Sequence, residues 1–308
     1  MKKCKWSVIK NVLILGCYII YALKNTFIGI LFAMLWASAA VATKTGVASV
    51  QPLVLGNIRF FIAGIFLLSV TYLFQKGEHY RLPKGKEWRQ LSIFGFLNTT
   101  LYLGLYVYAM KYSAAGIGSL AVSTTPLLIV IFSALFIGRF PQKKEIAGMI
   151  LGMTGVGLAT LPLLEGSITT IPGIVLLLLS MIAVAGASVY YARVKWSLPP
   201  LLINGWQVLL GGVFQLPLTL FTMERVANTW DTQFWYSVIW LSLAVSVVGL
   251  ICWFYLLMID TVKASFWLFL CPVFGFFYAW LLLGEPITWF TVAGTIMVLA
   301  GLLISRKN

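Results

Sequence analysis

Residues 126–155 read PLLIVIFSALFIGRFPQKKEIAGMILGMTG, and residues 272–301 read PVFGFFYAWLLLGEPITWFTVAGTIMVLAG. Among the positions that keep residue type between the two stretches, with an offset of 146 residues and no gap, six pairs define the repeat. The matched pairs are Pro126 with Pro272, Leu135 with Leu281, Gly138 with Gly284, Ala147 with Ala293, Gly148 with Gly294 and Gly155 with Gly301. Both copies lie in long apolar segments. A duplicated set of apolar helices is a common architecture among membrane transporters.

The composition excludes a soluble globular protein. Hydrophobic residues make up 61% of the chain and charged residues 10%, with a mean hydropathy of +0.96, whereas soluble domains carry about 25% charged residues. At about 20 apolar residues per crossing, the chain has room for roughly ten membrane helices and no sizeable soluble domain. The four cysteines have no metal-type spacing and imply no disulfide framework.

The hydropathy pattern predicts an all-α membrane protein with about ten transmembrane helices, because the apolar runs are far longer than the ~10 residues of a barrel strand. The predicted helices are residues 27–43, 53–74, 90–110, 114–137, 145–163, 173–192, 201–222, 234–258, 264–283 and 287–304.

Lysine and arginine determine the predicted orientation. With the N-terminus in the cytoplasm, 18 of these residues fall in cytoplasmic segments and 3 (Lys44, Lys111 and Arg225) on the opposite side, while Arg59 falls within a helix. This positive-inside bias predicts that both termini are cytoplasmic. Because the positive residues gather in segments on one side of the membrane, the net charge of +14 does not indicate binding to nucleic acid. The expected location is the plasma membrane, which is the inner membrane in bacteria.

The N-terminal segment does not fit the ten-helix pattern. Residues 12–23 are apolar but too short for a comfortable crossing, and lysines flank them on both sides. No small-residue cleavage site is evident before Lys24, which argues against a signal peptide. We therefore interpret residues 1–25 as an interfacial cytoplasmic segment or as the product of a start codon placed too far upstream.

The repeat extends over two halves of five helices each, residues 26–164 and 165–308. Residues 59–66 (RFFIAGIF) in the second helix align with residues 207–214 (QVLLGGVF) in the seventh. Because five is odd, the second half enters the membrane from the opposite side, so the repeat is inverted. Inverted repeats place a binding cavity near the bilayer midplane, where the halves meet.

These motifs resemble the EamA family of the drug/metabolite transporter superfamily. The family pattern has an Arg or Gln in the second helix of each unit, a Pro in the fourth, a Gly-Glu turn and a glycine-rich fifth helix. The second copy matches with Pro272, Gly284-Glu285, Gly294 and Gly301, whereas Arg139 replaces the glutamate in the first copy. Residues 108–114 (YAMKYSA) also resemble the family's link between helices three and four. The resemblance implies a ten-helix exporter or importer of small metabolites. We expect no cofactor and no bound metal.

Arg59 lies about 10 Å inside its helix at 1.5 Å per residue, where a charge normally has a partner. It could contact an anionic group of the substrate, or it could form a structural ion pair or bond to helix carbonyls. The polar Gln207 at the matched position favours the structural alternative. Glu285 lies on the same side of the membrane and is the predicted partner.

The cavity lining must come from polar and aromatic side chains of helices one, three, four, eight and nine, a choice that follows partly from the family resemblance. Ser and Thr can also bond to their own helix, so each is weak evidence alone. The predicted substrate-binding residues are Trp36, Asn98, Tyr102, Ser123, Ser246 and Trp253. Further candidates are Ser38, Tyr106, Ser119, Ser242, Ser265 and Trp267.

Two structural features recur in both halves. Pro126 and Pro272 occupy matched places within helices four and nine, where each is predicted either to fix a static kink or to act as a hinge. The glycines of helices five and ten, such as Gly148 and Gly301, predict close helix packing, either between the repeats or in a homodimer.

The sequence thus predicts a transporter of a small amphipathic metabolite, such as an amino acid, that works by alternating access. No Asp, Glu or His falls in the middle of a predicted helix, which favours facilitated diffusion or exchange over proton coupling. An intramembrane enzyme would need catalytic groups that are missing from these helices. A structural membrane protein that transports nothing remains the other alternative.

Overall fold

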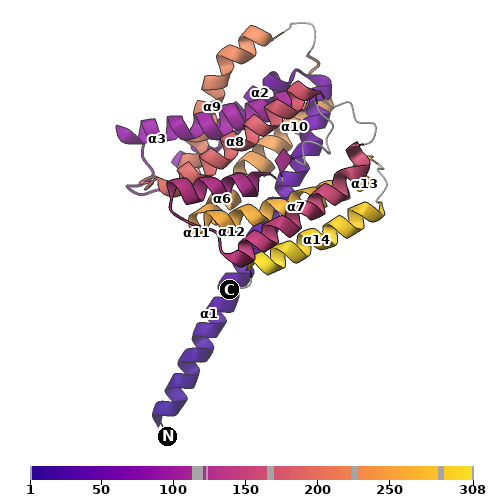
Figure 1. Ribbon diagram of the computed structural model, residues 1–308. Helices are drawn as coiled ribbons and strands as arrows, with labels where there is room; N and C mark the ends of the chain where they lie inside the picture. The colour runs from indigo at the N-terminus through magenta and orange to yellow at the C-terminus, as the bar shows by residue number, and fades with distance from the viewer. Residues whose placement is uncertain are drawn as a thin grey trace.

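The computed structural model describes the backbone of residues 2–112, 121–122, 124–164, 170–223, 228–283 and 288–306, and their side chains except at residues 2–22, 159–164, 279, 283 and 306. Every regular element within these ranges is a helix (Figure 1). The predicted all-α fold is therefore confirmed.

Ten spans correspond to the ten predicted helices. In order they are α1 (Lys2–Ser49); α2 (Pro52–Phe74); α3, η1 and α4 (Lys86–Gly95, Phe96–Leu101, Tyr102–Ala109); α6 (Thr125–Phe136); α7 (Lys143–Leu164); α8 (Ile171–Arg193); α9 (Pro200–Thr222); α10, η2 and α11 (Thr232–Ile239, Trp240–Gly249, Leu250–Ile259); α12, η3 and α13 (Thr261–Ser265, Phe266–Phe269, Leu270–Leu283); and α14 (Trp289–Arg306). Seven helices of the described chain are long and apolar enough to cross a membrane, and α6 and α14 are shorter apolar helices. The remaining span, α7, has 22 residues.

Helix α1 is longer than predicted. It runs without a break for 48 residues, or about 72 Å at 1.5 Å per residue, which is more than twice the ~30 Å hydrocarbon core. Only its part from Leu23 to Ser49 qualifies as a candidate span. The first half projects away from the bundle (Figure 1). The interfacial role of residues 1–25 stays a prediction.

Local sequence explains where several helices begin and end. Pro52, Pro172 and Pro200 lie in the first turns of α2, α8 and α9, where the missing N–H of proline has no helical partner to lose. Asp260 caps α12, because its carboxylate accepts hydrogen bonds from the N–H groups of the second and third residues after it. Gly138 follows the end of α6 with a φ of 76°, a conformation that favours glycine.

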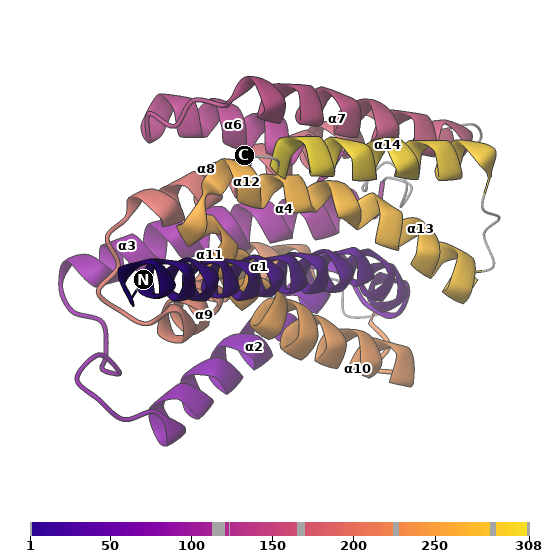
Figure 2. The same cartoon turned by 90° about the horizontal axis from the view of Figure 1, so that it is seen from below.

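The helices α7 and α14 are paired in a reciprocal way. They run side by side (Figures 1 and 2). A methyl group added at Gly148 would lie 2.5 Å from the carbonyl oxygen of Gly301, and one added at Gly155 would lie 2.7 Å from that of Gly294. In the repeat, Gly148 matches Gly294 and Gly155 matches Gly301. The contact of Gly148 with Gly301 therefore has its repeat equivalent in the contact of Gly294 with Gly155. Such exchanged contacts are the mark of a two-fold axis between antiparallel copies.

The helices α2 and α9 show the same exchange. A methyl group at Gly64 would lie 2.9 Å from Cβ of Leu209, and one at Gly212 would lie 3.7 Å from the ring of Phe61. With the offset of 148 residues for this helix pair, Gly64 matches Gly212 and Phe61 matches Leu209. Two helix pairs therefore share the inverted two-fold relation, and the glycines that were expected either in a dimer or between repeats pack between repeats of one chain.

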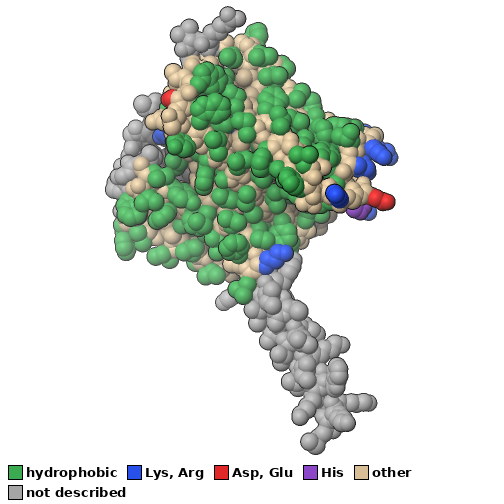
Figure 3. All heavy atoms as spheres, turned by 180° about the vertical axis from the view of Figure 1, so that it is seen from behind, with side chains coloured by type: hydrophobic (Ala, Val, Ile, Leu, Met, Phe, Trp, Pro, Cys, Tyr) green, Lys and Arg blue, Asp and Glu red, His purple; other side chains and the backbone are tan. Residues whose placement is uncertain are grey.

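The outer surface of the bundle is apolar. Hydrophobic side chains cover the face seen from behind, and the cations and the histidine on this face lie at its margins (Figure 3). Phe221, Ile171 and Phe74 are 90%, 78% and 75% exposed. Water would not tolerate so continuous an apolar surface, so lipid surrounds this multi-pass protein.

Candidate functional site

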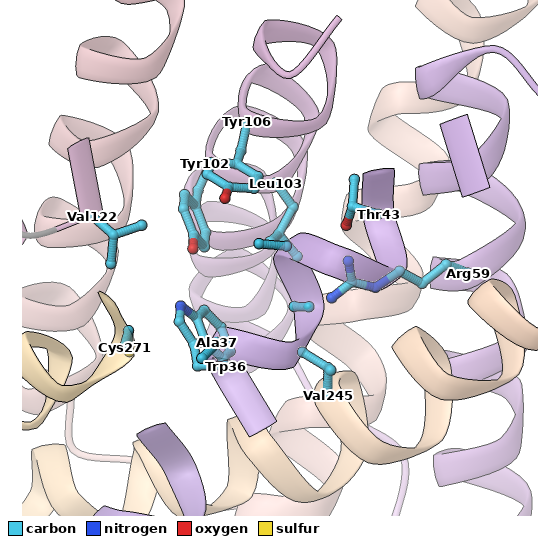
Figure 4. Close-up of a pocket in the computed structure, with 12 residues that line it drawn as sticks. Trp36, Ala37, Thr43, Arg59, Tyr102, Leu103, Tyr106, Val122, Val245 and Cys271 are labelled. Atoms are coloured by element: carbon cyan, nitrogen blue, oxygen red, sulfur yellow. The ribbon is translucent and has the colours of Figure 1, made fainter. Parts of the chain in front are cut away.

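A small cavity lies where the two halves meet. Its volume is about 40 Å³, which corresponds to only a few waters. The described residues that line it are Trp36, Ala37, Ala39, Ala40, Thr43, Arg59, Tyr102, Leu103, Tyr106, Val122, Val245 and Cys271. Figure 4 shows the labelled members converging from both halves, with Val245 and Cys271 from the second. In this conformation the cavity is nearly closed.

Arg59 is the charged member of this described lining. Its side chain extends from α2 toward the cavity (Figure 4), and the residue is only 3% exposed. The Nε atom donates a 3.0 Å hydrogen bond to the hydroxyl of Ser246, and the Arg59 carbonyl accepts one from Ser242. The guanidinium also lies 5.7 Å from the ring of Phe60. Within the described chain no carboxylate forms an ion pair with Arg59.

Gln207 occupies the matched position in α9 and is fully engaged. Its side-chain oxygen accepts hydrogen bonds from Thr99 at 2.8 Å and Asn98 at 3.4 Å, and its nitrogen donates to Asn204 at 3.1 Å. Arg59 matches Gln207 and Asn98 matches Ser246, both at an offset of 148. The polar contacts are therefore exchanged between the halves, as the glycine contacts are.

These exchanged contacts fall in two π-helical segments. Asn98 lies in η1 of the third span and Ser246 in η2 of the eighth. A π-helical turn places an extra residue in the helix and is often found at functional sites. Here it occurs at the matched place in both halves, next to the cavity.

Aromatic rings form the opposite wall. The rings of Trp36 and Tyr102 are stacked, with centroids 6.3 Å apart and an interplanar angle of 12°, and Tyr106 lies 6.3 Å from Tyr102. The Trp36 indole nitrogen and the Tyr102 hydroxyl point toward each other (Figure 4). Behind Trp36, the ring of Phe32 stacks on Trp253 at 4.9 Å. The wall can contact an apolar or aromatic group and offer hydroxyl donors beside it.

The structure brings together only some of the predicted substrate-binding residues. Trp36 and Tyr102 line the cavity. Asn98 and Ser246 are buried behind it as partners of Gln207 and Arg59, and Trp253 packs against Phe32. Their contact with substrate stays a prediction. Ser123 and Ser119, together with Glu285 as the predicted partner of Arg59, lie outside the described residues.

Thr43 and Cys271 line the cavity without having been selected from the sequence. Thr43 follows Trp36 by seven residues, which places both on one helical face, so this spacing could have identified it. Cys271 is buried with a free thiol. Its position directly before Pro272 is the sequence feature that could have identified it as a cavity residue.

Pro126 lies at the start of α6, whereas Pro272 lies near the start of α13 but inside the continuous span formed by α12, η3 and α13. Pro126 is in the first turn of α6, after a turn at Thr124, and Pro272 is the third residue of α13, after the 3₁₀ segment η3. Proline is tolerated in the first turn of α6 because no helical hydrogen bond is lost there, and at Pro272 the preceding 3₁₀ segment interrupts the α-helical pattern. Pro217 lies in the interior of α9.

An ion cluster joins the halves at the other end of these helices. Arg139 contacts Glu145 at 2.6 Å and Asp260 at 3.0 Å. These contacts raise the pKa of the Arg139 guanidinium, chiefly through its hydrogen bonds to Glu145. Ser133 and Thr261 share a 3.1 Å hydrogen bond beside the cluster. Arg139, which replaces the family's glutamate, thus links the end of α6 to the start of α12.

No group of three or more His, Cys, Asp or Glu side chains gathers within the described part of the chain, so no metal-binding cluster is assigned there. The features that remain are a two-fold pair of five-helix units and a small polar and aromatic cavity between them.

Comparison with known proteins agrees with this architecture. The pattern of the EamA-like transporter family matches residues 23–161 and 171–306, one match for each half. The chain belongs to the EamA-like transporter family. It is a membrane transporter by this membership.

Three relatives illustrate the family. The chain is 27% identical to the uncharacterized transporter YvbV of Bacillus subtilis (strain 168), over 93% of this chain and 92% of the relative. It is also 27% identical to an uncharacterized transporter of Archaeoglobus fulgidus, over 94% and 99%, and 28% identical to the uncharacterized inner membrane transporter YedA of Escherichia coli (strain K12), over 74% and 73%. A solved crystal structure with 19% identity has the same fold, with a TM-score of 0.75 over 92% of this chain and 97% of that one.

Proposed function

We propose that this transporter moves a small amphipathic metabolite, such as an amino acid, by alternating access between its two inverted halves. The observation that carries the proposal is the cavity lined by residues of both halves beside the exchanged contacts of α2, α9, η1 and η2. In an inverted repeat, rocking of matched elements can open either face around one central site.

The closed cavity requires movement before a substrate can enter, because about 40 Å³ is room for only a few waters. A second hollow, of about 380 Å³, is lined by Val47, Gln51 and neighbours at the far end of α1. Val47 follows the cavity residue Thr43 by one helical turn, so we infer that this hollow leads toward the cavity. By the predicted orientation it faces away from the cytoplasm.

The opposite route is held by the ion cluster of Arg139, Glu145 and Asp260. We infer that these contacts close the cytoplasmic side in this conformation. The helix starts at Pro126 and Pro272 are the proposed hinges, since each follows a segment that is not α-helical. Cys271 connects one of these hinges directly to the cavity wall.

The proposed location is the inner membrane with both termini in the cytoplasm. The distribution of Lys and Arg supports this orientation, and the printed name of YedA places that relative in an inner membrane. Single cysteines introduced near Lys76 and near Lys111 test this orientation, when each is exposed to a membrane-impermeant thiol reagent outside intact cells. Labelling of the Lys76 site from outside would contradict the proposed orientation.

Transport is tested by flux of a broad panel of labelled metabolites in proteoliposomes that contain the purified protein. At least one member should be carried, and Trp36→Ala should abolish its flux while the protein stays folded. Trp289→Ala is the matched control, because Trp289 is 79% exposed and remote from the cavity lining. No flux for any member would contradict the proposed function, and unchanged flux in Trp36→Ala would remove that residue from the site.

Facilitated diffusion or exchange is the proposed energetic mode, since no carboxylate or histidine lies in the middle of a described span. Flux should therefore persist when an ionophore collapses the pH gradient. Complete loss of flux would instead establish proton coupling.

A further inference from the structure

We propose that Arg59 is the anion receptor of the central cavity and that the transported compound carries a single carboxylate, an inference that rests on the proposed transport function. The first observation is an unneutralised buried charge. Arg59 is 3% exposed and lines the cavity, and Ser246 engages only its Nε atom. Among the described residues, its two terminal nitrogens have neither a hydrogen-bond acceptor nor a counter-ion.

Burial of a guanidinium in a membrane interior is costly unless an anion compensates it. The carboxylates that the structure describes are held elsewhere or lie in solvent: Glu87 pairs with Arg81, Glu145 and Asp260 with Arg139, while Asp231 caps α10. Glu78 lies in an exposed loop. A bound anionic group would supply the missing partner, and a guanidinium fork suits a planar carboxylate through two parallel hydrogen bonds.

The repeat provides an internal comparison. Gln207, the counterpart of Arg59, has both its amide atoms engaged by Thr99, Asn98 and Asn204. A structural role at this position is therefore fulfilled by a neutral side chain whose bonds are all made within the protein. Arg59 differs by a charge and by free donors that face the cavity (Figure 4). Packing alone does not account for that difference.

The entrance supports the same sign of charge. The larger hollow at the far end of α1 is lined by Lys44 and Lys111, with no carboxylate among its described lining residues. These two lysines and Arg59 form a cationic route from the surface to the cavity. Such a route raises the local concentration of anions and speeds their entry.

Charge balance favours one carboxylate over a phosphate. Arg59 is the one cation among the described residues that line the cavity, and a phosphate dianion would need further positive charge or donors. Trp36 and Tyr102 form the wall on the other side and suit an apolar or aromatic remainder. The assigned class is a small monoanionic or zwitterionic organic acid.

The test compares acids with their neutral amides on the full-length protein. The probes are benzoate, benzamide and phenyl phosphate, with leucine and leucinamide as a second pair. Binding is measured as thermal stabilisation in detergent, and transport as flux or competition in proteoliposomes. In the wild type we expect each acid to bind about 10- to 100-fold more tightly than its amide, the usual range for a hydrogen-bonded charge, and phenyl phosphate to bind more weakly than benzoate.

Arg59→Gln installs the side chain that the other half carries at this position, so it should fold. We expect the acid-to-amide ratio to fall to about one in this variant. Arg81→Gln, which removes a cation from a cytoplasmic loop, is the matched control and should keep the wild-type ratio. If Arg59→Gln fails to fold, the wild-type comparison alone decides.

Equal binding of acids and amides by the wild type would overturn the proposal, as would an acid preference that survives in Arg59→Gln or a preference for phenyl phosphate. An ion pair between Arg59 and Glu285 would show itself as equal destabilisation by Arg59→Gln and Glu285→Gln, with no advantage for acids, and would also overturn it. Transport of neutral or cationic compounds without acid preference would leave the proposed transport function intact. Failure of the wild type to bind or carry any compound would contradict that function as well.

Discussion

The reciprocal crossing of α7 and α14 makes a sharp prediction about two glycines on one helix. A methyl group at Gly148 would lie 2.5 Å from the carbonyl oxygen of Gly301 and 2.8 Å from Cβ of Ser305, whereas one at Gly157 meets no atom within 4 Å. Gly148→Ala should therefore force the two helices apart, while Gly157→Ala should be accepted without movement.

The magnitude follows from the size of the overlap. Ordinary contact distances begin at 3.4 Å, so the helix backbones must separate by most of an ångström at this point, and Gly155 holds them equally close nearby. Overpacking of this kind costs about 1–3 kcal/mol. At roughly 2 °C per kcal/mol for a long chain, the apparent unfolding midpoint should fall by about 2–6 °C. Gly157→Ala should leave it unchanged or raise it slightly, because alanine favours a helix.

The assay is the fraction of monodisperse protein that survives heating, measured by size-exclusion chromatography of wild type and both variants in the same detergent. Because membrane proteins often unfold irreversibly, identical heating times are essential. If Gly148→Ala matched Gly157→Ala in midpoint, the close two-fold crossing would not exist as described. Flux of an accepted substrate provides a second readout and separates a static contact from a moving one.

Three further predictions concern polar groups outside the cavity. Arg139→Ala should destabilise the protein by on the order of 3 kcal/mol in thermal unfolding, because it leaves the carboxylate of Glu145, 1% exposed, without its charge partner. The same change should release Asp260 and speed opening to the cytoplasm in flux assays. Unaltered stability and flux would contradict the closing role. Thr71→Val should be neutral or stabilising in the same unfolding assay, since the buried Thr71 hydroxyl has no hydrogen-bond partner, so a large loss would refute that assignment. The backbone N–H of Phe234 at the start of α10 and the hydroxyl of Ser49 lower the pKa of Asp231. Its contribution to stability is therefore present above its unfolded pKa and is lost as pH falls through the lower folded pKa. Asp231→Asn should weaken the dependence of the unfolding midpoint on pH below about 4, and an unchanged dependence in the variant would argue against the contribution.

The sequence predicted the architecture because membrane helices leave strong one-dimensional signals. Apolar runs of sufficient length located the ten spans, and the distribution of Lys and Arg gave their orientation. With five spans in each half, that orientation predicted that the two halves are antiparallel. The matched Gly148 and Gly294 revealed the repeat, and the structure adds that Gly148 packs against Gly301 while Gly294 packs against Gly155. Helix ends agreed less well, as α1 shows, because apolar composition alone does not mark where a helix stops.

The cavity was harder to predict, because the sequence around a polar helix residue does not show which residue it contacts in the folded chain. Asn98 is central and polar, and it turned out to bond to Gln207 of the other half. Trp253 is central and aromatic, and it packs on Phe32. Helical spacing identifies a face, but whether that face meets a cavity or another helix depends on a packing that only the folded chain defines.

The repeat also explains why one buried polar atom, the hydroxyl oxygen of Thr71, lacks a partner. Asn57 donates to Thr219 at 2.9 Å across the α2–α9 interface. At an offset of 148, Thr219 matches Thr71 and Asn57 matches Gly205, so the symmetric bond would need a side-chain amide where glycine stands. The unpartnered hydroxyl of Thr71 is the direct consequence of this divergence.

The same divergence shapes the cavity. Ten of its twelve described lining residues come from the first half and two from the second. An exact two-fold duplication would draw equally on both, so one half has acquired the polar and aromatic groups while the other closes against them. The charge of Arg59 falls in the half that contributes most of the wall, and its neutral counterpart Gln207 is bonded away from it. In the proposed mechanism, recognition of a substrate would therefore rest mainly on the first five helices. The symmetry that remains, in the glycine crossings and the exchanged polar pairs, would serve the proposed movement of one half against the other.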